Sequence, residues 1–177
     1  MTQTAGGLEP SGEGWFVVNA DEASWWRDEA FGASCPFESR ERRFPQIAYS
    51  LRVVEPGKPN CMYHGEDVQE DFLVLQGECL LLIEGQERRL RAWDFVHCPA
   101  WTEHVFVGAE APCVVLMIGA RPDEEVVYPR SELALGHRAG VERETRSPAE
   151  AYAGFPDSVR GRPDDASLPW RAGSGPR

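Results

Sequence analysis

The chain has 177 residues, enough for one domain with flanking segments, and it carries a formal net charge of -11 at pH 7. Residues 57–120 contain ten acidic side chains against four basic ones, so the central segment itself is acidic. We therefore expect neither nucleic acid nor an anionic membrane as a partner. Hydrophobic residues make up 42% of the chain, and no apolar run approaches the roughly 20 residues that a membrane-spanning helix needs.

The first residues show neither a charged nor an apolar leader region, which predicts a cytoplasmic protein. The five cysteines are widely spaced, odd in number and free of any C-x2-C pair. This spacing argues against a disulfide framework and against a zinc knuckle. We expect reduced and mostly buried thiols at Cys35, Cys61, Cys79, Cys98 and Cys113.

The first 43 residues are predicted to form a flexible N-terminus followed by a short strand and a helix. Residues 1–14 are rich in Gly, Thr, Ser and Pro, and we expect them to be flexible. Residues 15–43 should form a short strand at Trp15 to Val18 and a helix over Glu22 to Phe31, with Asp21 as its N-cap. Since so short a helix is not stable alone, this segment should pack on the central domain.

Residues 44–120 alternate between short β-prone runs and turn signals, which predicts an all-β antiparallel domain of jelly-roll type. Several runs, such as FLVL, CLLLI and CVVLMI, are apolar on both faces. Their outer faces need cover, either from the flanking segments or from a second subunit, and we predict a homodimer. The expected strands are 46–54, 60–64, 71–76, 79–84, 87–90, 94–98, 104–107 and 114–120.

Residues 121–177 form a C-terminal extension without a visible second core. Two stretches, Glu132 to Gly140 and Pro148 to Tyr152, have weak helical character, and three prolines interrupt the remainder. We expect a partly helical tail.

The chemistry concentrates in two motifs, one on each half of the central segment. In a strand, His64 and Glu66 share one face, and Glu70 can return to it after a short loop. His104 can join them only if the two halves fold back on one another. The motifs are His64-x-Glu66-x3-Glu70-x6-Gly77 and Pro99-x-Trp101-x2-His104.

This arrangement resembles the cupin family. Its first motif runs Gly, five residues, His-x-His, three or four residues, Glu, six residues, Gly. Glu70 and Gly77 match in full, His64 takes the first His position, and Glu66 stands where the second His is usual. Gly57 opens the motif one residue out of the usual phase.

The second cupin motif runs Gly, five residues, Pro-x-Gly-x2-His, three residues, Asn. Pro99 and His104 match it, whereas Trp93, Trp101 and Gly108 occupy the positions of the usual Gly, Gly and Asn. The resemblance implies a cupin-type double-stranded β-helix over residues 44–120. This fold hosts many unrelated reactions and some proteins without catalytic activity.

The residues in these motifs predict a metal site at His64, Glu66, Glu70 and His104. Imidazole and carboxylate donors suit one divalent first-row transition metal, namely Fe, Mn, Ni, Co or Zn. If Glu66 stays off the metal, the other three form a facial triad and Glu66 is a candidate catalytic base. Asp71 is an alternative to Glu70, which we prefer because Gly77 then lies at the family distance. Taken one by one, each residue could instead be a surface charge or a core histidine.

We interpret the side chains of Met62, Phe72, Trp101 and Phe106 as an apolar pocket wall, although a plain core role would also fit. The predicted function is a metal-binding cupin that acts on a small organic molecule, with the metal as Lewis acid or oxygen-binding centre. Dioxygenation, which would make it an oxidoreductase, isomerisation and decarboxylation all remain open. The alternative is a non-catalytic small-molecule-binding cupin.

Overall fold

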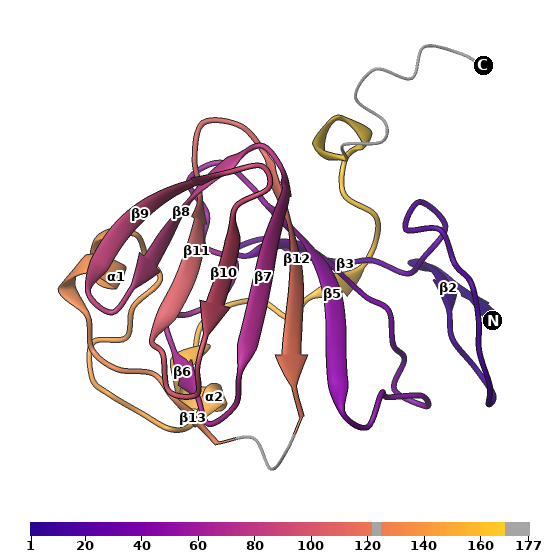
Figure 1. Ribbon diagram of the computed structural model, residues 1–177, viewed down its shortest axis with the longest axis horizontal. Coiled ribbons are helices and arrows are strands. Elements are labelled where there is room, and N and C mark those ends of the chain that lie inside the picture. The colour runs from indigo at the N-terminus through magenta and orange to yellow at the C-terminus, as the bar shows by residue number, and fades with distance from the viewer. Residues whose placement is uncertain (122–124, 169–177) are drawn as a thin grey trace.

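The computed structural model describes residues 1–121 and 125–168 (Figure 1). Its strands are β1 Thr2–Thr4, β2 Gly7–Glu9, β3 Trp26–Asp28, β4 Gly32–Pro36, β5 Ile47–Val54, β6 Gly65–Glu66, β7 Glu70–Gln76, β8 Glu78–Ile83, β9 Gln86–Arg91, β10 Phe95–Cys98, β11 His104–Gly108, β12 Cys113–Ala120, β13 Val126–Val127 and β14 Val159–Arg160. Its helices are α1 Glu132–Gly136, α2 Pro148–Ala151 and the short 3-10 helix η1 Asp165–Ser167. Within the described residues, no helix has the length and apolar character needed to cross a membrane.

Two antiparallel sheets form the central domain. The larger has seven strands in the order β10-β7-β12-β5-β4-β3-β14, and the smaller has three in the order β11-β8-β9. The predicted all-β jelly roll is confirmed. The order of the strands in the larger sheet differs from their order in the chain. Residues far apart in the chain, such as those of β7 and β12, therefore lie side by side in the barrel (Figure 1).

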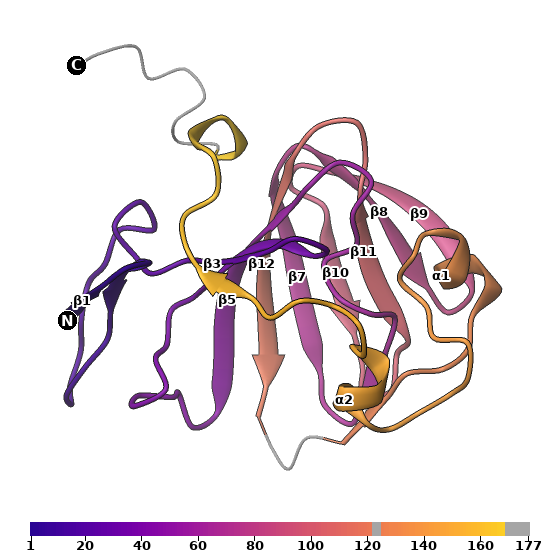
Figure 2. The ribbon, with the colours of Figure 1, turned by 180° about the vertical axis from the view of Figure 1, so that it is seen from behind.

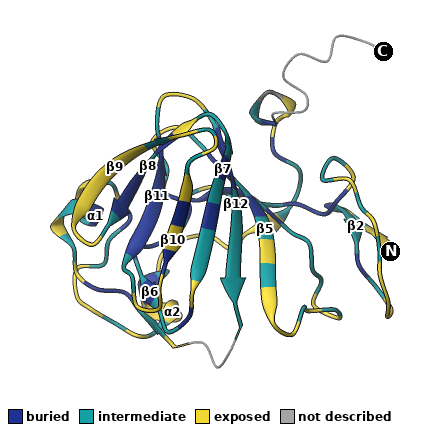
Figure 3. Ribbon diagram, viewed as in Figure 1, coloured by how far each residue is buried: buried dark blue, intermediate teal, exposed yellow. Residues whose placement is uncertain are grey.

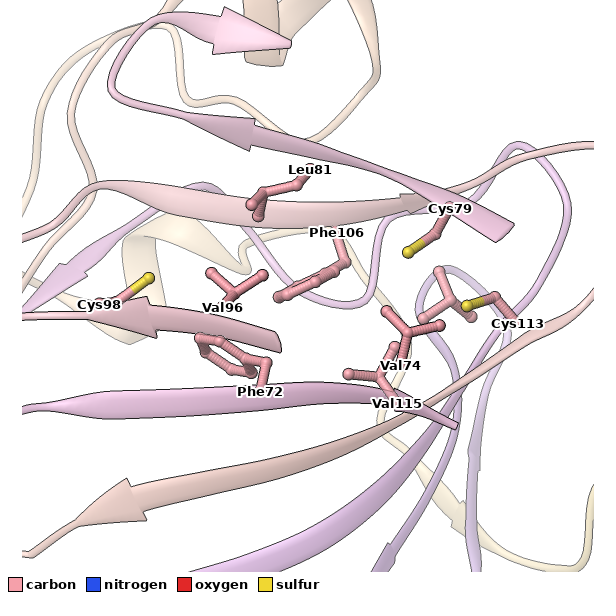
Figure 4. Close-up of a cluster of buried hydrophobic side chains, with 10 residues drawn as sticks. Phe72, Val74, Cys79, Leu81, Val96, Cys98, Phe106, Cys113 and Val115 are labelled. Atoms are coloured by element: carbon pink, nitrogen blue, oxygen red, sulfur yellow. The ribbon is translucent and has the colours of Figure 1, made fainter. Parts of the chain in front are cut away.

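The inner faces of the two sheets pack on each other over one apolar core. Phe72 on β7 and Val115 on β12 face Leu81 on β8 and Phe106 on β11, and all four are buried. Figure 4 shows these side chains pointing into the space between the strands. This core closes one end of the barrel and leaves the other end to polar side chains.

The outer apolar faces are covered by the flanks of the chain. Trp25, fully buried, and Leu168 pack over Leu51 and Val53 on the outer face of β5. On the other sheet, the segment around α1 covers the outer faces of β8 and β11 (Figure 2). Every residue of β11 is consequently buried, whereas β9 is largely exposed (Figure 3). The flanks therefore supply the cover that we expected either from them or from a second subunit.

The predicted helix over Glu22 to Phe31 is wrong. Its residues contribute β3 instead, which pairs with β4 and β14 at the end of the larger sheet. The expected N-cap, Asp21, binds Arg162 through a 2.6 Å hydrogen bond. Asp28 accepts hydrogen bonds from the backbone of Ala30 and Phe31, which favours a turn over a helix. Pairing between distant strands thus overrides a weak local helical signal.

Three other segments differ from expectation in detail. Residues 1–14, expected to be flexible, contain the β1–β2 hairpin, while Trp15 to Val18 forms no strand. Asn60 to His64 forms only isolated bridges along the edge of β11. The helices α1 and α2 begin at the predicted residues, with Ser131 and Ser147 as N-caps, but α1 ends four residues early. The C-terminal extension beyond residue 168 lies outside the described residues.

Candidate metal centre

The backbone places the two motif histidines directly opposite each other. His64 and His104 form an antiparallel bridge, with hydrogen bonds of 3.2 Å from the His64 amide and 2.8 Å from the His104 amide. Their ring centroids are 5.0 Å apart. The two halves of the central segment therefore fold back on each other, as the sequence requires if His104 is to join the other donors.

Both imidazoles are held in one orientation by backbone carbonyls. His64 Nδ1 lies 2.8 Å from the Met62 carbonyl oxygen, and His104 Nδ1 lies 3.0 Å from that of Thr102. Because a carbonyl only accepts hydrogen bonds, each Nδ1 carries the proton and donates. Each Nε2 is then the nitrogen that points to the shared centre, which is the arrangement common among metal-binding histidines.

Two carboxylates complete the cluster. Glu70, the first residue of β7, brings Oε2 within 3.4 Å of His104 Nε2. Glu66 on β6 brings Oε1 within 3.4 Å of His64 Nε2. Ligand atoms of His64, Glu70 and His104 all lie within 4.8 Å of one another. Metal ions bind such donors at about 2.0–2.2 Å, so the spacing fits a single ion between these three residues.

Burial sets the charge on two members of this cluster. Burial, together with the neighbouring His64, lowers the pKa of His104 to about 4. The His104 ring is therefore neutral at pH 7, as a metal ligand must be. Burial also raises the pKa of Glu70 to about 7, and the nearby Glu66 carboxylate acts in the same direction.

The other two members form a charged pair. The hydrogen bond from His64 lowers the pKa of Glu66 despite its burial. Burial alone would lower the pKa of His64, but the Cys61 thiol and the Glu66 and Glu70 carboxylates raise it well above its ordinary value. Without a metal, the cluster thus retains a proton on His64, and a bound dication would displace it.

Asp71, the alternative to Glu70, faces away from this centre. Its Oδ1 lies 2.6 Å from Nδ1 of His97, whose side chain is about half exposed on the outer surface. Successive residues of β7 point to opposite faces, so Glu70 points inward and Asp71 outward. The preference for Glu70 thus agrees with the direction of its side chain.

The four residues proposed as pocket wall separate into different places. Phe72 lines the cavity next to the cluster, its ring centroid 5.0 Å from that of His104. Phe106 is fully buried behind Phe72, with ring centroids 4.9 Å apart. Met62 packs with Tyr128 outside the cavity lining, and Trp101 is exposed on the surface. Only Phe72 stands on the cavity wall beside the donors.

The cavity at this end of the barrel has a volume of about 420 Å³ and is more polar than the sequence suggested. Arg43, Arg52 and Arg121 line it, as do Tyr128 and Tyr152 from the C-terminal extension. Sequence reasoning missed all five. One signal was available, because polar residues alternate with Leu and Val in the predicted strand 46–54. The two tyrosines lie in a segment that shows no such pattern.

Trp93 and Trp101 stand where the motif usually has glycine, and their backbone keeps the left-handed conformation that glycine adopts easily. Their φ angles are 76° and 68°, in the left-handed region that is unfavourable for a bulky side chain. The Trp93 amide bonds the Val74 carbonyl, and the Trp101 amide bonds the Glu66 carbonyl at 2.6 Å. The turn geometry that positions Glu66 is therefore kept at a cost in backbone strain.

Residues 50–119, which include both histidines and both carboxylates, match the family model described as the cupin domain. Together with the two packed sheets, this match identifies residues 50–119 as a cupin domain. A comparison with curated protein sequences finds no match.

Solved cupin structures share this fold at low sequence identity. A sugar phosphate isomerase from Silicibacter pomeroyi is 19% identical, with a TM-score of 0.54 over 67% of this chain and 88% of that one. The polyketide cyclase RemF from Streptomyces resistomycificus is 15% identical, with a TM-score of 0.53 over 62% and 83%. A proposed sugar phosphate isomerase from Acidithiobacillus ferrooxidans is 29% identical, with a TM-score of 0.43 over 46% of this chain. Only 54% of that chain is covered. These likenesses concern the fold, and the functions named for these proteins differ.

Proposed function

We propose that this cupin binds one divalent first-row metal through His64, Glu70 and His104 and is an enzyme that acts on a small organic molecule. One observation carries the proposal: the ligand atoms of these three residues lie within 4.8 Å of one another. In addition, the Nδ1 atoms of the two imidazoles are held by hydrogen bonds to backbone carbonyls. Surface charges gathered by chance would not share such an anchored arrangement.

The donor set suits Fe, Mn, Ni, Co or Zn, because imidazole nitrogen and carboxylate oxygen bind all of these ions. A bound ion would act as a Lewis acid or as an oxygen-binding centre. Three protein ligands would leave coordination positions for a substrate atom. His104 and Glu70 would contribute from the barrel wall, and His64 from the segment that borders β11.

We assign Glu66 the role of base. Its carboxylate contacts His64 Nε2 at 3.4 Å, but it is not one of the three residues whose ligand atoms lie within 4.8 Å of one another. A carboxylate beside the metal ligands can take a proton from a substrate and return it at another atom. This placement favours a reaction with proton transfer, such as an isomerisation, over a dioxygenation. Phe72 and Met117 supply the apolar part of the cavity in which the substrate would lie.

Elemental analysis tests the metal site on protein made without an affinity tag. We expect about one metal ion per chain in the wild type after metal supplementation, and none in His64→Ala or His104→Ala. The matched control is His97→Ala, which removes an exposed imidazole that pairs with Asp71 on the outer surface. This control should keep the full metal content.

A full complement of metal in His104→Ala, or none in the supplemented wild type, would contradict the proposal. In the second case the non-catalytic small-molecule-binding cupin becomes the better account of the cavity.

The homodimer and the cytoplasmic location stay predictions from the sequence. Because the flanks cover the outer sheet faces, a subunit contact would use the apolar side chains that remain exposed. Phe95 on the edge strand β10 and Trp93 just before it are 62% and 74% exposed and offer such a surface.

A further inference from the structure

The cavity changes character across the larger sheet. At the β7 side its lining carries the metal-binding cluster, whereas at the β4 and β5 side the inward-facing residues include Ser34, Ser50 and Arg52. Ser34 pairs with Arg52 across the two strands, so these side chains stand in one row. An apolar slot, which the sequence suggested, would not present such a row.

The strand pattern fixes the direction of the Arg52 side chain. Its neighbours Leu51 and Val53 are buried on the opposite face of β5, under Trp25. Because alternate residues of a strand face opposite ways, Arg52 must point into the barrel. It lines the cavity there together with Asn60 and Tyr152.

Arg52 lacks partners of its own in this position. Its Nε is buried without a hydrogen-bond partner among the described residues, and it makes no ion pair with any described carboxylate. Arg121, by contrast, pairs with Glu38 at 2.5 Å. A guanidinium group offers five donors, and burying one unpaired costs free energy.

Two polar neighbours of Arg52, Asn60 and Tyr152, use their polar atoms in other contacts. The Asn60 side-chain oxygen accepts from the Phe106 amide, and its nitrogen lies 3.9 Å from the Met117 sulfur. The Tyr152 hydroxyl accepts from the Met62 amide. A ligand in the cavity can therefore supply the acceptor that Arg52 Nε does not find among the described residues.

We propose that Arg52 binds the anionic group, carboxylate or phosphate, of the small organic molecule that occupies the cavity. A guanidinium fork matches both groups through paired N–H donors. This inference rests on the proposed function, because it names the substrate class of the same site. The Glu66 and Glu70 carboxylates at the other end repel an anion, so the charges of the cavity orient the ligand.

Strand spacing also sets the size of the ligand. The strand β12 lies between β5 and β7, so Arg52 and Phe72 stand on strands about 10 Å apart. The arginine side chain covers part of this distance. The substrate is therefore a molecule of several carbon atoms with its anionic group at one end and the reacting group at the other.

Calorimetric titration of chelator-treated, metal-free protein tests this assignment with succinate and inorganic phosphate as probes. We expect the wild type to bind at least one of them, and the preferred probe tells a carboxylate site from a phosphate site. In Arg52→Gln the dissociation constant should rise about tenfold to hundredfold. Arg88→Gln, which removes an exposed arginine of β9, is the matched control and should bind as the wild type does.

A second variant guards against misfolding. Arg52→Lys keeps the charge but loses the fork, so its affinity should lie between those of the wild type and Arg52→Gln. Arg52→Gln should melt no lower than the wild type, since it removes a charge with no internal partner. Equal anion affinity in the wild type and both Arg52 variants, or no anion binding in the wild type, would overturn the inference.

The metal content separates this inference from the proposed function. Arg52→Gln should keep the metal of the wild type, because Arg52 is no ligand. If the wild type takes up no metal after supplementation but binds an anion through Arg52, the metal proposal fails and this one stands.

Discussion

The two ends of the cavity differ in how the chain prepares them. At the donor end, formed by His64, Glu66, Glu70 and His104, each imidazole is fixed by a backbone carbonyl and each carboxylate contacts an imidazole. At the arginine end, Arg52 extends from β5, and its buried Nε finds no hydrogen-bond partner within residues 1–121 and 125–168. The chain thus supplies contacts for the polar groups of the donor end, whereas we propose that a ligand supplies the contact for Arg52.

Packing explains why the donor end is rigid. The Phe72 ring packs against His104 and, edge to face, against Phe106. The apolar core of the barrel continues from these two phenylalanines (Figure 4). Ligand residues held by packed neighbours lose little freedom when a metal binds, so affinity is gained. No comparable support surrounds the Arg52 guanidinium.

The largest difference should follow from changing the two carboxylates of the donor end. Glu70→Gln should weaken metal binding by about one to two orders of magnitude, because it removes a charged ligand. Glu66→Gln should keep the metal and lose turnover, because a base is removed instead. Calorimetric titration with Mn²⁺ measures the first effect directly, and succinate affinity in the metal-free protein should not fall in either variant.

Comparable loss of metal in both variants would make Glu66 a fourth ligand and leave the reaction without its assigned base. Wild-type metal affinity in both would remove the cluster from the account altogether.

A smaller effect is expected at Trp93 and Trp101, the two tryptophans at motif positions where glycine is usual. Trp93→Gly should stabilise the protein by about 0.5–1 kcal/mol, because glycine accepts the left-handed backbone without strain. Trp101→Gly should gain less, since it also loses the contact of Arg146 with the indole ring. Urea unfolding measures both changes.

The control here is Trp93→Ala, which removes the ring but keeps the strained Cβ. A gain in stability as large as that of Trp93→Gly would show that the exposed ring, not the backbone, is the source of the cost.

Much of the central domain could be predicted from the sequence. The strands from β7 to β12 agree with expectation to within one residue at each end, because each is a short apolar run between clear turn signals. The order of the motif residues also placed His64 and His104 on opposed segments. These features depend on local pattern and on spacing, which a single sequence contains.

The N-terminal segment could not be predicted in the same way. Residues 22–31 have the composition of a short helix, but β3 gains its partners from β4 and from β14, which lies more than a hundred residues later in the chain. A partner so distant leaves no trace in a local window. Trp25 is buried as expected, yet in an extended segment rather than on a helix.

The arginine end was missed for a related reason. Its residues come from β4, β5 and β12, and β12 lies beside β5 only because the sheet order differs from the chain order. The motifs drew attention to an apolar wall, and of its four proposed members only Phe72 lines the cavity beside the donors. A basic residue at an alternate position of a buried strand is the one local sign of this second end.

The account makes one central claim, a metal at the donor end of a cavity that binds an anion at its other end. Anomalous diffraction from crystals grown with Mn²⁺ and succinate tests it most directly. We expect an anomalous peak within about 2.0–2.3 Å of His64 Nε2, His104 Nε2 and a Glu70 oxygen, and a carboxylate hydrogen-bonded to Arg52. A peak bound instead by surface residues such as Asp71 and His97, with no anion at Arg52, would contradict the claim.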